Sequence, residues 1–284
     1  MQDVQHFRPG KLSQALPRIQ AAIEERDRDG RLGRFAYAAC DLRTGERAFL
    51  GACDHQLPTA SVVKLPFHSA LGILAEEGVL GFNEPVTVTR DDLVFGSGIL
   101  QHLTLPLTLS LADLAMLMVI VSDNTATNAL IRRVGVSRVN ETFHQMGLGD
   151  GIVLRRPIRD EHEEDDLFGL ARPEVLLEYL VGISEERWPG SGRTLDAAFR
   201  QQHRTLMARD LPLETEGPTG LQVANKTGSD DGVRCDVGIV RGLGRDFAFV
   251  MMVADSADRT YPPVHPAELA IAEAARLTFD ALAP

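Results

Sequence analysis

The first apolar residues of the chain recur at intervals of three and four positions. This spacing places them on one face of a helix and predicts an amphipathic first helix that ends near Gly30 and Gly33. The apolar positions are Leu12, Leu16, Ile19, Ala22 and Ile23. Two β-compatible segments, 35–42 and 46–52, lie on either side of an Arg-Thr-Gly turn at 43–45, which predicts a pair of strands.

The pattern over 58–220 is mainly helical. Its clearest helical stretches are 63–80, 111–121, 125–134 and 173–183. Strand character returns near Leu221, and two short strands, 237–240 and 247–253, are separated by a Gly-Leu-Gly turn. An alanine-rich helix over 266–282 closes the chain.

This order of elements predicts an α/β fold of the α+β sandwich type. Tight turns between neighbouring strands favour antiparallel pairing, so we expect a five-stranded antiparallel sheet flanked by the terminal helices. The two chain ends, 1–57 and 221–284, would form this discontinuous sheet domain, and 58–220 would form an inserted all-helical domain. We expect the active site in the cleft between the two domains, because ligands often bind in such clefts.

Composition narrows the range of partners. The chain has 284 residues, of which 44% are hydrophobic, and a net charge of −11, which disfavours binding to a nucleic-acid backbone. No apolar stretch is long enough to span a membrane. The N-terminal segment has no signal-peptide pattern, so the sequence as written predicts a cytoplasmic protein, or a secreted or periplasmic one if an export signal was removed. We expect a monomer that acts on a small molecule.

Metal and cofactor chemistry are not indicated by the sequence. Cys40, Cys53 and Cys235 form an odd, sparse set that is unlike a disulfide framework, and neither they nor the scattered histidines match a zinc motif. The cysteines and Trp188 are interpreted as structural or incidental. We therefore expect no bound metal and no cofactor.

A serine and a lysine three residues apart form the first candidate site. Ser61 and Lys64 open the helix predicted over 63–80, so their side chains share a face and the amine can sit beside the hydroxyl. The helix N-terminus offers free N–H groups and positive potential, which suit a developing oxyanion. The alternative is a helix cap followed by a surface lysine. As a catalytic pair, Lys64 should lie within hydrogen-bond reach of the Ser61 hydroxyl.

A second motif, Ser122-Asp123-Asn124, lies between two predicted helices. Aspartate and asparagine are good N-caps, so this motif could simply start the following helix. In the functional interpretation, the Ser122 hydroxyl relays a proton to a leaving group and Asn124 holds a substrate amide.

A third motif, Lys226-Thr227-Gly228, follows a strand-like stretch and precedes Ser229. It could be a plain junction between a strand and a turn. In the functional interpretation, Gly228 lets a substrate lie against the strand backbone, and Lys226 and Thr227 hold a substrate carboxylate.

Together, the motifs Ser-x-x-Lys, Ser-Asp-Asn and Lys-Thr-Gly, in this order, resemble the active-site set of the class A β-lactamases and penicillin-binding serine enzymes. The run SDNTATN at 122–128 extends this resemblance, and so do the segments 96–100 and 232–234. The resemblance covers most of the chain and implies the sheet-plus-helical fold expected above.

The resemblance also implies a role for each motif residue. Ser61 would attack a carbonyl and become acylated, Lys64 or a carboxylate would accept its proton, and Ser122 would pass a proton to the departing nitrogen. The backbone N–H groups of Ser61 and Ser229 would form the oxyanion hole. The substrate-binding residues would be Asn124, Lys226, Thr227, Gly228, Ser229 and Arg234.

One pattern of this family is missing. The deacylating glutamate of the family lies in a Glu-x-x-Leu-Asn pattern, and the corresponding stretch here, 154–166, is acidic with a different spacing. Glu163 is the expected base, with Asp160, Glu161 and Glu164 as the other candidates. If this stretch is only a solvated acidic loop, Lys64 remains as the base and deacylation of β-lactams would be slow.

The predicted activity is that of a serine hydrolase that opens the β-lactam ring. Two alternatives remain: a serine amidase, esterase or D,D-peptidase-like enzyme with weak or no β-lactamase activity, and a non-catalytic domain that binds β-lactams or cell-wall ligands. The presence of Ser61, Lys64, Ser122 and Lys226 argues against the binding-only alternative. A Ser-His-Asp hydrolase is disfavoured because the chain has no Gly-x-Ser-x-Gly elbow.

Overall fold

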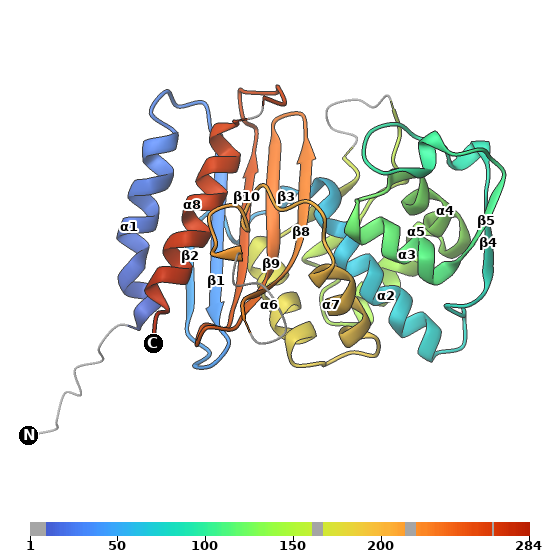
Figure 1. The fold of residues 1–284 in the computed structure, drawn as a ribbon, viewed down its shortest axis with the longest axis horizontal. Helices are drawn as coiled ribbons and strands as arrows, with labels where there is room; N and C mark the ends of the chain where they lie inside the picture. Colours follow the sequence, from blue (N-terminus) through green and yellow to red (C-terminus); the bar gives the residue numbers. More distant parts are fainter. Residues whose placement is uncertain (1–9, 161–166, 214–219, 263) are drawn as a thin grey trace, which may run out of the picture.

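The computed structural model describes residues 10–160, 167–213, 220–262 and 264–284. Its central feature is a five-stranded antiparallel sheet in the order β2-β1-β10-β9-β8, built from both ends of the chain (Figure 1). The strands are β1 Arg34–Asp41, β2 Arg47–Gly51, β8 Gln222–Asp230, β9 Val233–Arg241 and β10 Phe247–Ala254. The predicted antiparallel sheet is therefore confirmed.

The inner strands of this sheet are apolar because both of their faces are covered. Successive side chains of a strand point to opposite faces, so β1 supplies two separate cores. Ala36 and Ala38 belong to a core shared with α6 (Pro173–Ser184), whereas Tyr37 and Ala39 belong to one shared with the terminal helices. All eight residues of β10, at the centre of the sheet, are buried.

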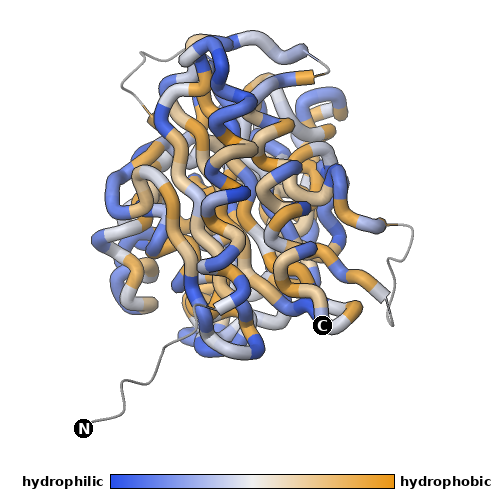
Figure 2. The backbone as a smooth tube through the Cα atoms, turned by 90° about the vertical axis from the view of Figure 1, so that its left-hand side faces the viewer, coloured by the Kyte–Doolittle hydropathy of each residue, from blue (hydrophilic) through white to orange (hydrophobic). Residues whose placement is uncertain are grey.

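The two terminal helices cover one face of the sheet, as predicted. Helices α1 (Lys11–Arg26) and α8 (Pro266–Ala281) pack against each other and lie side by side over the strands (Figure 1). Figure 2 looks at this side of the molecule, and hydrophilic and hydrophobic residues alternate along the helices that face the viewer. This alternation is expected of helices that bury one face and expose the other.

The segment between the two sheet-forming ends contains most of the helices. Besides α6, they are α2 Lys64–Glu76, α3 Leu111–Ile120, α4 Asn124–Val134, α5 Val136–Gln145 and α7 Ser191–Phe199, with 3₁₀ turns η1 Ala60–Val63, η2 Arg90–Asp92 and η3 Leu100–His102. Helices α5 and α7 were not among the elements predicted from the sequence. Among the described residues, no helix combines the length and hydrophobicity needed to cross a membrane.

The expectation that 58–220 would be all helical needs correction. Two small sheets lie within or at the edge of this segment, one ordered β3-β7-β6 and the other pairing β4 with β5. Their strands are β3 Leu57–Pro58, β4 Pro85–Val88, β5 Leu107–Ser110, β6 Ile152–Leu154 and β7 Gly169–Ala171. Strands of two to four residues are too short to give a recognisable alternation, so the sequence pattern could not reveal them.

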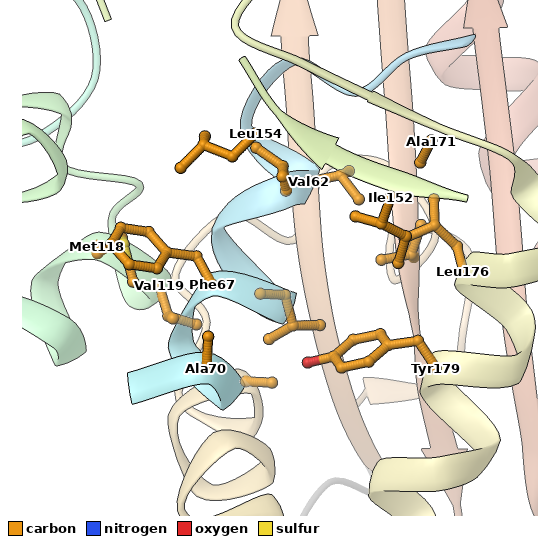
Figure 3. Packing of buried hydrophobic residues seen from close by; sticks show 14 of the residues in the cluster. Val62, Phe67, Ala70, Met118, Val119, Ile152, Leu154, Ala171, Leu176 and Tyr179 are labelled. Carbon is orange, nitrogen blue, oxygen red and sulfur yellow. The ribbon is translucent and has the colours of Figure 1, made fainter. Parts of the chain in front are cut away.

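Helix α2 lies at the centre of the helical part and is buried on nearly all sides. Its residues from Lys64 to Leu74 are all buried. Figure 3 shows α2 between Met118 and Val119 of α3 on one side and Leu176 and Tyr179 of α6 on the other. Because a helix packed in this way cannot shift without disturbing several neighbours, it holds the residues at its N-terminus in a fixed position.

Candidate active site

A cleft of about 630 Å³ is lined by residues from the sheet and from the helical segment. Five of the predicted site residues line it: Ser61, Ser122, Asn124, Thr227 and Ser229. Lys64, Lys226, Gly228 and Arg234 are buried behind its surface or beside it. The structure therefore brings the three sequence motifs together, although their residues are up to 167 positions apart in the chain.

Ser61 lies in η1, one turn ahead of α2, rather than on the helix itself. The preceding residue, Ala60, has a φ of +41°, a left-handed conformation that non-glycine residues adopt at a cost. The Ser61 hydroxyl faces the cleft and makes no hydrogen bond with any described residue. A serine in a strained turn, whose hydroxyl has no hydrogen-bond partner among the described residues, is suited to attack a bound carbonyl.

Lys64 is the first residue of α2, and its amine points towards the second motif. Its Nζ donates to the backbone oxygen of Ser122 at 2.8 Å, to Ser122 Oγ at 3.2 Å and to Asn124 Oδ1 at 2.7 Å. The expected hydrogen bond to Ser61 is not formed. All three acceptors belong to the second motif, so the position of Lys64 on the same helix face as Ser61 did not determine its hydrogen-bond partners.

Ser122 connects the two buried lysines. Its Oγ lies 3.2 Å from Lys64 Nζ and 3.1 Å from Lys226 Nζ, and its φ of +55° is again left-handed. Lys226, on β8, also donates to the backbone oxygen of Thr227 at 2.7 Å. A hydroxyl between two amines can accept a proton from one neighbour while donating to another group, so this arrangement forms a path for proton transfer.

Burial lowers the pKa of both amines. Burial and the positive charge of Lys226 hold the pKa of Lys64 well below its usual value, against the opposing attraction of Asp123. Burial lowers the pKa of Lys226 to about 7, partly offset by attraction to Asp236. An amine whose pKa is near neutrality can lose and regain a proton at physiological pH, which a surface lysine cannot.

Asp236 and Asn225 support this site and were not found by sequence reasoning. Asp236 is fully buried on β9, where it accepts hydrogen bonds from Asn225 Nδ2 and from the backbone N–H of Met207, and burial raises its pKa to about 7. The sequence did hold a signal, because an aspartate inside the apolar strand VRCDVGIV has to be paired. Only the fold shows that its charge acts on Lys226.

Asp123 has the capping role that the sequence allowed. Its Oδ1 accepts from Ala126 N at the start of α4, while its Oδ2 accepts from the backbone N–H groups of Ile99 and Leu100 at 2.7 and 2.9 Å. Asn124 uses its amide within the protein as well, since Nδ2 donates to the oxygen of Phe95 at 3.0 Å. The second motif therefore anchors the loop over 95–100 at the rim of the cleft.

Gly228 is required because the backbone of the turn that carries Ser61 passes too close to leave room for a side chain. A Cβ atom at this position would lie 2.5 Å from the oxygen of Thr59 and 3.2 Å from the nitrogen of Ser61. From the sequence, Gly228 was expected to make room for a substrate, whereas the structure shows that it lets β8 approach the η1 turn that carries Ser61.

We expect Gly228→Ala to destabilise the fold by about 1–3 kcal/mol and to slow acylation, because β8 and η1 would have to separate. Thermal unfolding and acylation rates measure the two effects. Gly81→Ala is the matched control, since a Cβ there meets nothing within 4 Å. Equal unfolding temperatures and rates for the two variants would contradict this account of Gly228.

Arg234 does not line the cleft. Its side chain is fully buried on β9, and its guanidinium donates to Glu268, which does line the cleft, at 3.2 Å. Tyr261, another cleft residue, covers the guanidinium with its ring at 4.4 Å. Contact between Arg234 and a substrate stays a prediction, and the guanidinium is in contact with two residues that line the cleft, Glu268 and Tyr261.

The acidic loop is described only in part. Asp160 lines the cleft, and its Oδ1 accepts from the backbone N–H of Phe95 at 2.7 Å. Glu161, Glu163 and Glu164 lie outside the described residues. The choice of deacylation base among these four residues therefore stays a prediction.

His203 also lines the cleft, and sequence reasoning did not single it out. Burial is the main cause that lowers its pKa, and the positive charges of Lys226 and Lys64 contribute. The imidazole is therefore neutral at pH 7 and adds no charge to the cleft wall.

Known proteins resemble this chain over nearly its whole length. The sequence model of the Beta-lactamase enzyme family matches residues 17–282. A β-lactamase from Streptomyces fradiae is 29% identical over 299 residues, which cover 98% of this chain and 89% of that protein.

Solved structures show the same fold. The β-lactamase from Sphaerobacter thermophilus superposes with a TM-score of 0.82 and 27% identity, over 93% of this chain and 96% of that one. PBP-A superposes with a TM-score of 0.79 and 26% identity, over 96% of this chain and 98% of that one. A PBP-A mutant, with a TM-score of 0.78 and 26% identity over 94% of this chain and 96% of its own, has been solved as an acyl-enzyme complex with penicillin G.

Proposed function

Because this chain belongs to the beta-lactamase enzyme family, as a class A β-lactamase-like serine enzyme, we propose that it opens the β-lactam ring through an acyl-enzyme at Ser61. One observation carries the proposal. Ser122 Oγ lies between the amines of Lys64 and Lys226, in the same cleft as the unoccupied Ser61 hydroxyl. This arrangement supplies a nucleophile, a base and a proton donor for the leaving nitrogen.

Acylation would proceed by attack of Ser61 Oγ on the lactam carbonyl. The Lys64 amine, in its neutral form, would exchange one of its present acceptors for Ser61 Oγ and take the hydroxyl proton. The negative oxygen of the tetrahedral intermediate would be held by the N–H groups of Ser61 and Ser229. When the C–N bond breaks, Ser122 would donate its proton to the nitrogen and recover one from a neighbouring lysine.

The site would lie between two units, as the sequence analysis predicted. The proposed sheet unit, 1–57 with 221–284, contributes Thr227 and Ser229 to the cleft, and the unit 58–220 contributes Ser61 and Ser122. In this proposal Lys226 and Thr227 attract and orient the polar end of a substrate, and Asn124 contacts its amide. Gly228 acts indirectly, by positioning the turn that carries Ser61.

Hydrolysis also requires a base that activates water for deacylation. Asp160 supports this role for the acidic loop, because its carboxylate lines the same cleft as Ser61. Glu163 remains the first candidate of the sequence analysis, with Glu161 and Glu164 beside it.

We expect one variant in the series Asp160→Asn, Glu161→Gln, Glu163→Gln and Glu164→Gln to trap the acyl-enzyme. Loss of the base should slow deacylation by about 10²- to 10⁴-fold and leave acylation nearly unchanged. Pre-steady-state kinetics would show a burst followed by a stall in that variant, and the other three variants serve as controls. If all four turn over like the wild type, the loop is not the source of the base and Lys64 takes that role.

A second candidate function is that of a peptidase-like or esterase-like serine enzyme. β-Lactams would acylate such an enzyme, and the acyl-enzyme would be hydrolysed slowly. The absence of a Glu-x-x-Leu-Asn pattern favours this candidate, and so does the similarity, at 26% identity, to a PBP-A mutant that has been solved as an acyl-enzyme complex with penicillin G. A nitrocefin assay run beside intact-mass detection of the acyl-enzyme separates the candidates. Steady turnover supports the β-lactamase, a stable adduct without turnover supports the second candidate, and neither signal contradicts both.

A further inference from the structure

Gln201 joins three parts of the fold through one buried side chain, and the residue is only 1% exposed. Its Nε2 donates to the backbone oxygen of Val119 at 3.0 Å and to that of Asn225 at 3.3 Å. Its Oε1 accepts from the backbone N–H groups of Gln202 at 2.9 Å and His203 at 3.0 Å. Both N–H groups and both lone pairs of the amide are therefore used, which gives the side chain one fixed orientation.

The bond to Val119 holds the end of the helix that leads to Ser122. Helix α3 ends at Ile120, and the last carbonyl groups of a helix have no partner within it. Gln201 supplies a partner for the Val119 oxygen, and the backbone N–H of Gln202 supplies one for the Ile120 oxygen at 2.9 Å. Ser122 follows with a φ of +55°, a conformation that persists only where the surrounding structure holds it. The two capping bonds contribute to that hold.

The bond to Asn225 holds the strand that carries Lys226. Strand β8 is the last in the order of the sheet, so one of its edges has no neighbouring strand, and Gln201 binds the backbone oxygen of Asn225 at this edge. Asn225 Nδ2 returns a hydrogen bond to the backbone oxygen of His203 at 3.3 Å. The segment that begins at Gln201 is therefore tied to β8 twice, directly before Lys226.

On its other side, Ser122 is held without the help of Gln201. Lys64, on α2, donates to the backbone oxygen of Ser122 at 2.8 Å and to its Oγ at 3.2 Å. From β8, Lys226 Nζ reaches Ser122 Oγ at 3.1 Å. This last distance depends on how closely β8 is held to the end of α3, and Gln201 binds both elements.

We propose that Gln201 is a positioning residue for proton transfer: by binding the end of α3 and the edge of β8 together, it keeps Lys226 within hydrogen-bond reach of Ser122 while Ser122 protonates the leaving nitrogen. The inference rests on the proposed acylation of Ser61. When the lactam C–N bond breaks, the nitrogen takes the electron pair of that bond and the proton of Ser122 Oγ. The Lys226 ammonium then gives a proton to Ser122 and is reprotonated from water.

The attack on the carbonyl does not depend on Gln201, because Ser61 and its base Lys64 lie on η1 and α2. Loss of Gln201 should therefore impair departure of the nitrogen more than attack by Ser61. A residue that only stabilised the fold would impair both steps alike.

The test compares two β-lactams whose leaving nitrogens differ in their need for a proton. Ring opening of benzylpenicillin releases a basic amine. The nitrogen released from nitrocefin is conjugated with the dinitrostyryl group, so it departs with less help from a proton donor. Second-order acylation rates are measured by rapid mixing at pH 7 for the wild type and for Gln201→Met, which fills a similar volume without these hydrogen bonds. The ratio of the benzylpenicillin rate to the nitrocefin rate should fall about tenfold in the variant.

Gln202→Met is the matched control. It is the same substitution at the next residue, whose side chain is exposed and lies outside the cleft lining, and its backbone N–H still caps Ile120. Its ratio should equal that of the wild type. Gln201→Glu is a second variant: it keeps the acceptors for the N–H groups of Gln202 and His203 and loses the two donated bonds, so its ratio should fall as well. Each ratio is internal to one variant and does not depend on the fraction of folded protein.

Two results would overturn the inference. One is a ratio that changes by less than threefold in Gln201→Met and Gln201→Glu, whether both rates fall together or neither falls. The other is a ratio that falls as far in Gln202→Met as in Gln201→Met. Either result leaves acylation of Ser61 intact and removes only the inference. Absence of any adduct of the wild type with both compounds would instead overturn the proposed function, and the inference with it.

Discussion

Ser61→Ala is expected to abolish covalent labelling by β-lactams. Its hydroxyl is the proposed nucleophile, and loss of such a group lowers the rate by about 10⁴- to 10⁶-fold. The fold should be retained within about 0.5 kcal/mol, because the Ser61 hydroxyl makes no hydrogen bond with a described residue and faces the cleft. Intact-mass spectrometry after incubation with a penicillin measures the labelling, and thermal unfolding measures the stability.

Ser137→Ala is a suitable control for this experiment. Ser137 is exposed on α5 and lies outside the cleft lining, so its removal should leave labelling unchanged. A Ser61→Ala variant that is still labelled at the wild-type rate would place the nucleophile elsewhere and remove the central claim.

Lys64→Met should reduce acylation by about 10²- to 10⁴-fold, the usual contribution of a general base. Methionine fills a similar volume but cannot accept a proton from Ser61 or return one through Ser122.

The wild type should lose activity as the pH falls through the pKa of Lys64, because protonation removes the base. Since burial and Lys226 lower that pKa, the loss should occur well below pH 10.5. The acylation rate measured as a function of pH checks both expectations.

The chain offers a close control for Lys64→Met. Lys11, Lys64 and Lys226 are its only lysines among 29 basic residues, and Lys11 lies on an exposed part of α1. Lys11→Met should therefore retain full activity. If Lys64→Met keeps more than a tenth of the wild-type rate, the proton must leave by another route, and Lys226 acting through Ser122 is the alternative.

The scarcity of lysine is itself informative. Arginine stays protonated at any physiological pH, whereas a buried lysine can become neutral, so of these two residue types only lysine can accept a proton in this cleft. Two of the three lysines are fully buried and contact the same serine hydroxyl. The sequence motifs identified both residues, but their shared partner could not be read from them.

The sequence by itself determined most of the longer elements, although not α5 and α7, and the identity of the motif residues. The helical spacing near the N-terminus, the apolar strands at both ends and the order of the three motifs are local features, and local sequence carries that information directly. The five-stranded antiparallel sheet followed from short turns between strands. The very short strands β3 to β7 were not predicted, because two to four residues are too few to show an alternation of apolar and polar positions.

The tertiary structure alone decided how the polar side chains are paired. Helical spacing suggested that Lys64 would contact Ser61, but its amine instead contacts Ser122 and Asn124, which approach from the α3–α4 junction. Arg234 was expected to meet the substrate, yet Glu268, 34 residues further along the chain, pairs with it. Hydrogen bonds and ion pairs depend on distances of a few ångströms between segments remote in sequence, and only packing of the whole fold fixes those distances.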